Sequence, residues 1–309
     1  MSGGKPDGPS FVRRVTGKLG RSSGVQVDED LWASIQLARH AERPYTLDYI
    51  NRITSDFEEM HGDRLFGDDP AMVAGFGRFN DRAVAFVGQQ KGRDTNERTY
   101  RNFGMASPEG YRKSMRVMEI ANRMGMPIVT LIDTPGAFPG ASAEERGQGG
   151  AISRSMQLMW RLDVPVVAVV IGEGSSGGAL GLGIADRVLM LENSTYSVIS
   201  PEGASAILWR DASQAKRAAQ AFKPTAANCY RWGVADAVIP EPPGGAHTDH
   251  EQAAEILGQY LQRTLLELEA QTPAERRVVR RERFRRLGPL RDPEGGVAMA
   301  SGRDAPPPG

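Results

Sequence analysis

The chain runs Val166-Val167-Ala168-Val169-Val170-Ile171 and continues Gly172-Glu173-Gly174-Ser175-Ser176-Gly177-Gly178-Ala179-Leu180. The first part is apolar and mostly β-branched, which predicts a buried strand. Six of the twelve residues from Gly172 to Gly183 are glycine, so the backbone after the strand can approach a ligand closely. A short helix starting there would direct its first N–H groups at negative charge. The stretch therefore predicts an anion or oxyanion site at the end of a strand.

The same stretch fits a dinucleotide-binding pattern. Gly172, Gly174 and Gly177 read G-x-G-x-x-G, and the next apolar run ends in the acidic Glu192. An NAD-binding oxidoreductase is therefore one alternative. Further glycines follow closely and make a poor long helix, which counts against it.

A nucleophile elbow is the second alternative. Residues 174–178 read G-x-S-x-G with Ser176 at the centre, and Asp211 or Asp236 followed by His247 gives the chain order of a serine hydrolase. His247 stands in a Pro- and Gly-rich stretch that is typical of a loop. A loop histidine is more often a solvated or hydrogen-bonded residue than a triad base.

The third interpretation needs no nucleophilic side chain. The backbone N–H groups around Gly177 and Gly178 can stabilise an oxyanion, and the missing side chains let a carbonyl come close. The rest of the chain has to distinguish between these three interpretations.

A second glycine-rich turn follows another apolar strand. Residues 128–132 are apolar but for one threonine, and the turn is Asp133-Thr134-Pro135-Gly136-Ala137-Phe138-Pro139-Gly140. Residues 151–162 leave room for one helix before the strand at Val166. Strand, loop and helix recur in this way in parallel α/β proteins.

The tetrapeptide Ser-Pro-Glu-Gly occurs at 107–110 and again at 200–203. A capping serine before proline at the first helical position is typical of a helix start. The first copy opens a predicted helix with regularly spaced apolar residues that ends at Gly125.

Several motifs in this order resemble one family, the carboxyltransferase alpha subunit of multisubunit bacterial acetyl-CoA carboxylase. The resemblance runs from about Leu37 to His247 and more loosely into the arginine-rich tail. Its motifs are Lys91-Gly92-Arg93, Arg101-Asn102-Phe103-Gly104-Met105, Pro108-Glu109-Gly110-Tyr111-Arg112-Lys113, Asp133 to Gly140, Glu144-Glu145-Arg146-Gly147-Gln148, Gly172 to Leu180 and Ser194 to Gly203.

The resemblance implies an α/β fold of the ClpP/crotonase type, a superhelix of ββα units. It implies a carboxyltransferase that acts with a separate beta subunit, as an α2β2 heterotetramer. Carboxybiotin on the biotin carboxyl carrier protein, formed by biotin carboxylase, would give its carboxyl group to acetyl-CoA. The product would be malonyl-CoA for fatty acid biosynthesis, and any zinc would belong to the beta subunit.

Four site residues follow from the resemblance. The backbone of Gly177 and Gly178 would form an oxyanion hole that faces carboxybiotin, and Gly136 and Ala137 would form part of the same biotin-side wall. The hole for the acetyl-CoA enolate would come from the beta subunit. Ser175 departs from the family pattern, which more often has glycine there.

Composition indicates a cytoplasmic enzyme. The formal net charge is zero, and no apolar run approaches the length of a membrane span, so neither a global nucleic-acid bias nor membrane insertion is expected. The single cysteine, Cys229, cannot form an intrachain disulfide and is expected to be a small buried residue. The four histidines lack metal-ligand spacing, so we expect no metal in this chain.

The chain divides into three predicted parts. Residues 1–26 are expected to be a disordered basic segment, residues 27–271 the crotonase-like carboxyltransferase domain, and residues 272–309 an arginine-rich helix with a disordered tail. Seven arginines fall within the eleven residues from Arg276 to Arg286. Such a run is expected to be a solvated helix face or a subunit contact, ahead of nucleic-acid binding.

Overall fold

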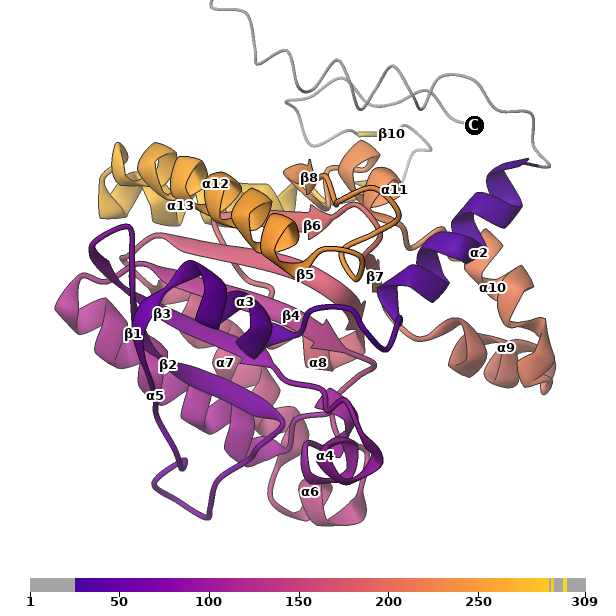
Figure 1. Ribbon diagram of the computed structural model, residues 1–309, viewed down its shortest axis with the longest axis horizontal. Helices are drawn as coiled ribbons and strands as arrows, with labels where there is room; N and C mark the ends of the chain where they lie inside the picture. Colours follow the sequence, from indigo (N-terminus) through magenta and orange to yellow (C-terminus); the bar gives the residue numbers. More distant parts are fainter. Residues whose placement is uncertain (1–25, 289, 292–296, 299–309) are drawn as a thin grey trace, which may run out of the picture.

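The computed structural model describes residues 26–288, 290–291 and 297–298, and a mixed β-sheet forms its centre (Figure 1). The strand order is β1-β2-β3-β4-β5-β6-β8, and β7 pairs with the end of β5. β1, β2 and β3 pair antiparallel, and the later pairings of this sheet are parallel. The predicted α/β class is therefore confirmed. The strands are β1 (Ser55–Glu59), β2 (Met72–Phe79), β3 (Arg82–Gln89), β4 (Ile128–Thr134), β5 (Val166–Ser175), β6 (Arg187–Leu191), β7 (Thr195–Ser197) and β8 (Ala237–Ile239), with a separate pair β9 (Leu290–Arg291) and β10 (Val297–Ala298).

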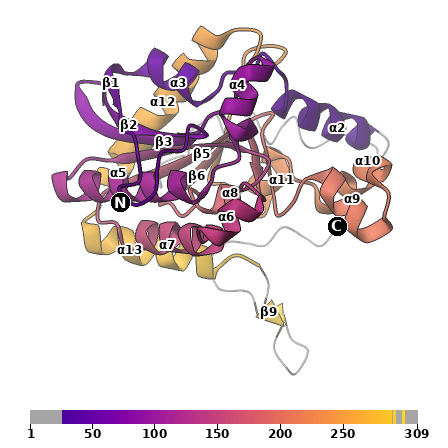
Figure 2. The same cartoon turned by 90° about the horizontal axis from the view of Figure 1, so that it is seen from below.

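Helices cover both faces of the sheet. Figure 2 shows α3 and α12 on one side, with α5, α7 and α13 on the other. Among the described residues, no helix is both long and apolar enough to cross a membrane. The helices are α2 (Gln26–Ala38), α3 (Thr46–Ile53), α4 (Thr95–Tyr100), α5 (Pro108–Met124), α6 (Ala141–Glu145), α7 (Gln148–Arg161), α8 (Ser176–Leu180), α9 (Pro201–Trp209), α10 (Ala215–Phe222), α11 (Ala226–Arg231), α12 (His250–Glu269) and α13 (Pro273–Arg285), with 3-10 turns η1 (Asn102–Gly104) and η2 (Ala212–Gln214).

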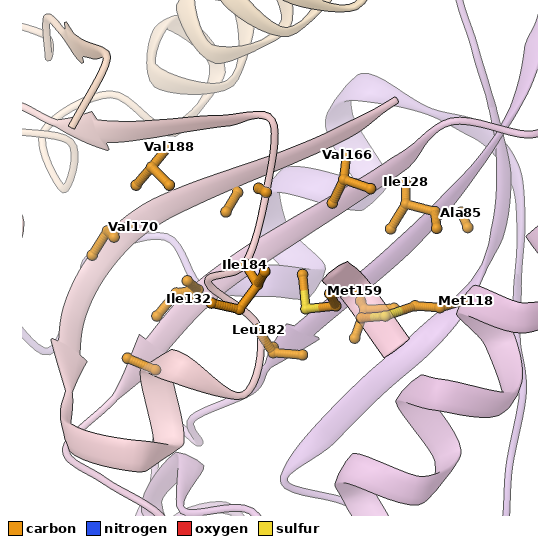
Figure 3. Packing of buried hydrophobic residues seen from close by; sticks show 14 of the residues in the cluster. Ala85, Met118, Ile128, Ile132, Met159, Val166, Val170, Leu182, Ile184 and Val188 are labelled. Atoms are coloured by element: carbon orange, nitrogen blue, oxygen red, sulfur yellow. The ribbon is translucent and has the colours of Figure 1, made fainter. Parts of the chain in front are cut away.

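The central strand β5 is apolar throughout because both of its faces are buried. Val166, Ala168 and Val170 point into one core with α5 and α7, part of which Figure 3 shows. Val167 and Val169 point into the opposite core, against α12. A strand of a parallel sheet covered on both faces needs this unbroken apolar run, which is the pattern that the sequence shows.

The two Ser-Pro-Glu-Gly copies both start helices, but they are capped differently. Ser200 accepts a hydrogen bond from the amide of Gly203 at 3.1 Å, as predicted. The hydroxyl of Ser107 makes no capping bond, because the amide of Gly110 donates to the Ser107 carbonyl instead, at 3.0 Å. At the other end of α5, Gly125 takes up the left-handed conformation expected of a helix terminator.

The arginine-rich helix α13 is more than a solvated face. Arg276 and Arg280 are buried, which corrects the expectation for these two residues. The guanidinium of Arg280 donates to both carboxylate oxygens of Asp186 at 2.8 Å, and Asp186 also accepts from the amide of Val166. This pair fixes α13 to the start of β5. The expected disorder of the two chain ends concerns residues that lie almost entirely outside the described ones.

Replacing Arg280 with methionine should lower the free energy of unfolding by about 3–5 kcal/mol, because Asp186 would keep a buried charge without its cation. Urea denaturation of the purified chain measures the change. The matched control is Arg281→Met, on the exposed side of the same helix, which should stay within about 0.5 kcal/mol of the unmodified protein. Equal losses for both variants would contradict the role assigned to Arg280.

Candidate active site

The two glycine-rich loops meet at the ends of the neighbouring parallel strands β4 and β5. A Cβ atom added to Gly178 would lie 2.5 Å from the carbonyl carbon of Gly136 and 2.7 Å from the amide nitrogen of Ala137. No side chain fits in that space. The structure therefore brings together three of the four residues that the resemblance implied, and Gly177, next in the chain, is partly exposed beside them.

The turn from β5 into α8 has the backbone shape of an elbow. Ser176 is exposed and has φ +58°, a left-handed conformation that is uncommon for a residue with a side chain. The chain reverses here from strand to helix within one residue. Because the first amides of a helix have no partner inside it, those of Ser176, Gly177 and Gly178 are potential donors to a ligand.

The residues of a hydrolase triad are not assembled around Ser176. The carboxylate of Asp211 accepts from Ser213, and that of Asp236 accepts from Arg283 and from a backbone amide. The ring of His247 stacks on that of His40 with 3.8 Å between centroids. Burial, with the positive charges of neighbours, lowers the pKa of His247. The serine hydrolase alternative is not supported.

The dinucleotide pattern also has another explanation. Gly172 and Gly174 lie inside β5, and α8 is only five residues long, unlike the long helix that a dinucleotide site requires. A Cβ on Gly172 would lie 2.5 Å from Oδ1 of Asp133. Gly172 is needed so that this carboxylate can reach the backbone of β5. The NAD-binding alternative is not supported.

A partly buried cluster of charged side chains lies beside the two loops, and the sequence analysis did not assign it to the site. Oδ1 of Asp133 accepts from Nζ of Lys91 at 2.7 Å and from the amide of Glu173 at 2.9 Å. The Glu173 carboxylate lies 3.6 Å from Lys91 and 2.7 Å from the guanidinium of Arg39. Asp133, Lys91 and Glu173 each lie within two residues of the carboxyl end of their strand, and that placement was the available signal in the sequence.

Lys91 remains charged in this cluster. Its burial alone would favour the neutral amine, but the charges of Asp133 and Glu173 outweigh that effect and raise the pKa of Lys91. The cluster therefore ties the ends of β3, β4 and β5 together through charge-assisted hydrogen bonds. Arg39 extends it to α9 through its ion pair with Glu202 at 2.8 Å.

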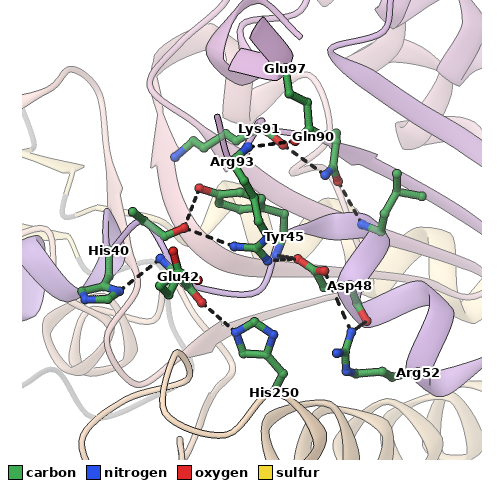
Figure 4. Close-up of polar contacts among 12 residues, drawn as sticks. His40, Glu42, Tyr45, Asp48, Arg52, Gln90, Lys91, Arg93, Glu97 and His250 are labelled. Carbon is green, nitrogen blue, oxygen red and sulfur yellow. Dashed lines mark hydrogen bonds and ion pairs between the residues drawn. The ribbon is translucent and has the colours of Figure 1, made fainter. Parts of the chain in front are cut away.

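Residues on both sides of Lys91 hold the start of α3 (Figure 4). The guanidinium of Arg93 pairs with Asp48 at 2.5 Å and lies over the ring of Tyr45, 4.7 Å from its centroid. The side chain of Gln90 accepts from the amide of Leu47 at 2.9 Å. Within the Lys91-Gly92-Arg93 motif, Lys91 thus joins the strand ends and Arg93 holds the start of α3.

Comparison with known proteins places the chain in a family. A family model described as acetyl co-enzyme A carboxylase carboxyltransferase-like matches residues 22–288. The chain belongs to this family. The acetyl-coenzyme A carboxylase carboxyl transferase subunit alpha of Deinococcus radiodurans is 56% identical over 257 residues, 83% of this chain and 81% of that protein. The protein of the same name from Geobacter sulfurreducens is 55% identical over 83% of this chain and 80% of its own length.

Two solved structures share the fold. Transcarboxylase 12S has a TM-score of 0.55 at 23% identity, over 71% of this chain and 42% of that chain. The beta subunit of geranyl-CoA carboxylase from P. aeruginosa has a TM-score of 0.57 at 19% identity, over 75% of this chain and 44% of its own. The crotonase-type fold that the sequence resemblance implied is thereby confirmed. Within the described residues, no cluster of histidine, cysteine or acidic side chains could hold a metal ion.

Replacing either of two neighbouring glycines in α8 with alanine should have different effects on the free energy of unfolding. Gly178→Ala should lower the free energy of unfolding by about 1–3 kcal/mol, because its Cβ would overlap the 136–137 peptide. Gly177→Ala is the control: its Cβ would meet only Ile152, at 3.5 Å, and alanine is the better helix former. Urea denaturation compares the two. If Gly177→Ala were the more damaging, the packing described for the loops would be wrong.

Proposed function

We propose that this chain is the alpha subunit of the acetyl-CoA carboxylase carboxyltransferase and that it transfers the carboxyl group of carboxybiotin to acetyl-CoA, giving malonyl-CoA for fatty acid biosynthesis. The observation that carries the proposal is the 56% identity to a carboxyl transferase alpha subunit over 83% of this chain. The meeting of the two glycine loops supports it, because it offers backbone donors without a nucleophilic triad.

In this proposal, the amides of Gly177 and Gly178 form the oxyanion hole for biotin, and Gly136 and Ala137 form the wall beside it. Release of the carboxyl group leaves negative charge on the ureido oxygen of biotin, which N–H donors held in place can stabilise. Each such donor is worth about 3–4 kcal/mol in the transition state. The exposed turn at Ser176 supports the assignment, since it leaves the start of α8 accessible.

A beta subunit supplies the remaining half of the reaction. It stabilises the acetyl-CoA enolate and completes an α2β2 assembly that receives carboxybiotin from the biotin carboxyl carrier protein, downstream of biotin carboxylase, in the cytoplasm. The region around α9, which lies away from the central sheet in Figure 1, supports a partner. Val198, Ile207 and Leu208 are 77%, 73% and 66% exposed there, and apolar side chains that gather on a surface often mark a binding site.

The chain alone should therefore have no carboxyltransferase activity, because it holds only one of the two oxyanion holes. Mixed with the beta subunit of the same organism, it should decarboxylate malonyl-CoA when biotin is added. A coupled assay for acetyl-CoA measures the rate, and each subunit alone is the control. Full activity of the purified alpha chain would contradict the two-subunit proposal.

Ser176→Ala should retain most of the activity of the assembled enzyme, because the proposal uses the backbone amides of α8 and not the hydroxyl. An enzyme that used Ser176 as its nucleophile would instead lose nearly all activity in this variant. Fluorophosphonate labelling of the unmodified chain is the second readout. Stoichiometric labelling of Ser176 together with ester hydrolysis would overturn the carboxyltransferase proposal.

A further inference from the structure

Gln89, the last residue of β3, connects the two halves of the candidate site with one side chain. The side chain is fully buried. Its Nε2 donates to the carbonyl oxygen of Gly178 at 3.0 Å, and its Oε1 accepts from the amide of Asp133 at 3.2 Å. Both ends of the amide are thus bound to backbone atoms, one at the end of β4 and one in α8.

The bond to Gly178 fills a gap in the hydrogen bonding of α8. The carbonyls on either side of it have backbone donors, because Gly177 accepts from Gly181 at 3.0 Å and Ala179 accepts from Leu182 at 3.1 Å. A helix of five residues cannot satisfy its last carbonyls internally. Gln89 therefore satisfies the carbonyl of Gly178 from a different strand.

This bond restricts how α8 can rotate relative to the sheet. One side of Gly178 rests against the 136–137 peptide, and its carbonyl is held by Gln89. These two contacts hold Gly178 in place, and with it the direction in which the amides at the start of the helix point. Donors that act on a developing charge must be aligned before the reaction, and small displacements are costly.

We propose that Gln89 is a positioning residue that aligns the oxyanion-hole amides of Gly177 and Gly178, a role that rests on the proposed function. It does not touch the reacting atoms itself. Its backbone partner Asp133 belongs to the charged cluster with Lys91 and Glu173, and α8 contributes no titratable side chain. Thr46 of α3 donates to the backbone carbonyl of Gln89.

The test uses Gln89→Met in the assembled alpha–beta enzyme, with biotin-dependent decarboxylation of malonyl-CoA as the assay. The variant keeps the length of the side chain but loses the donor to Gly178. Its kcat should fall by about 10- to 10²-fold, while the KM for malonyl-CoA should stay within about twofold. The matched control is Gln90→Met, since the Gln90 side chain bonds the amide of Leu47 and the carbonyl of Lys91 and not α8.

A second variant, Gln89→Glu, separates alignment from a general loss of packing. Protonated, the acid can donate to the Gly178 carbonyl, and ionised it cannot. Its kcat relative to the unmodified enzyme should therefore be low at pH 8 and rise as the pH falls. The same ratio for Gln90→Glu should be flat.

Equal kcat values for Gln89→Met and Gln90→Met, or a flat pH ratio for Gln89→Glu, would overturn the role of Gln89 and leave the proposed function standing. An inactive unmodified assembly would overturn the proposed function itself. If Gln89→Met does not assemble with the beta subunit, the pH dependence of the relative kcat of Gln89→Glu tests the role of Gln89. Failure of both variants to assemble would show a purely structural residue.

Discussion

The candidate site depends on one close contact between two backbones. Gly178 approaches the peptide between Gly136 and Ala137 so closely that a Cβ atom would lie 2.5 Å from the Gly136 carbonyl carbon. A side chain at this position would force the loops after β4 and β5 apart. This contact brings the start of α8 beside the 136–137 peptide, where we propose that biotin binds. The glycine at 178 is therefore required by the protein's own packing.

The same kind of constraint explains why the stretch resembled two other motifs. Gly172 must be glycine because Asp133 occupies the space of its side chain. At Gly174 a Cβ would lie 3.0 Å from the Tyr196 ring and 3.2 Å from the Thr195 carbonyl oxygen, a tight fit against β7. Packing thus accounts for Gly172 and Gly178, one glycine of each pattern, without a dinucleotide or a triad. Short glycine patterns become specific only with their structural context.

Local sequence patterns predicted the helices and strands well. They did not predict the ion pairs between residues that are far apart in the sequence. The apolar run at β5, the proline start and glycine end of α5, and the two glycine loops were all visible in the sequence. The pairing of Lys91 with Asp133 spans 42 positions and that of Arg280 with Asp186 spans 94. No local periodicity indicates which carboxylate meets which cation. The arginine-rich run consequently suggested a solvated face, although two of its members are buried.

The Gly177 and Gly178 assignment came from family resemblance, and the geometry that supports it became visible only with the sheet assembled. Its most direct test is a crystal structure of the alpha–beta enzyme with biotin bound. We expect the ureido oxygen to lie within about 2.7–3.2 Å of the backbone nitrogens at the start of α8, beside the 136–137 peptide. A ureido oxygen bound by a side chain such as Ser176, or biotin held away from both loops, would contradict it.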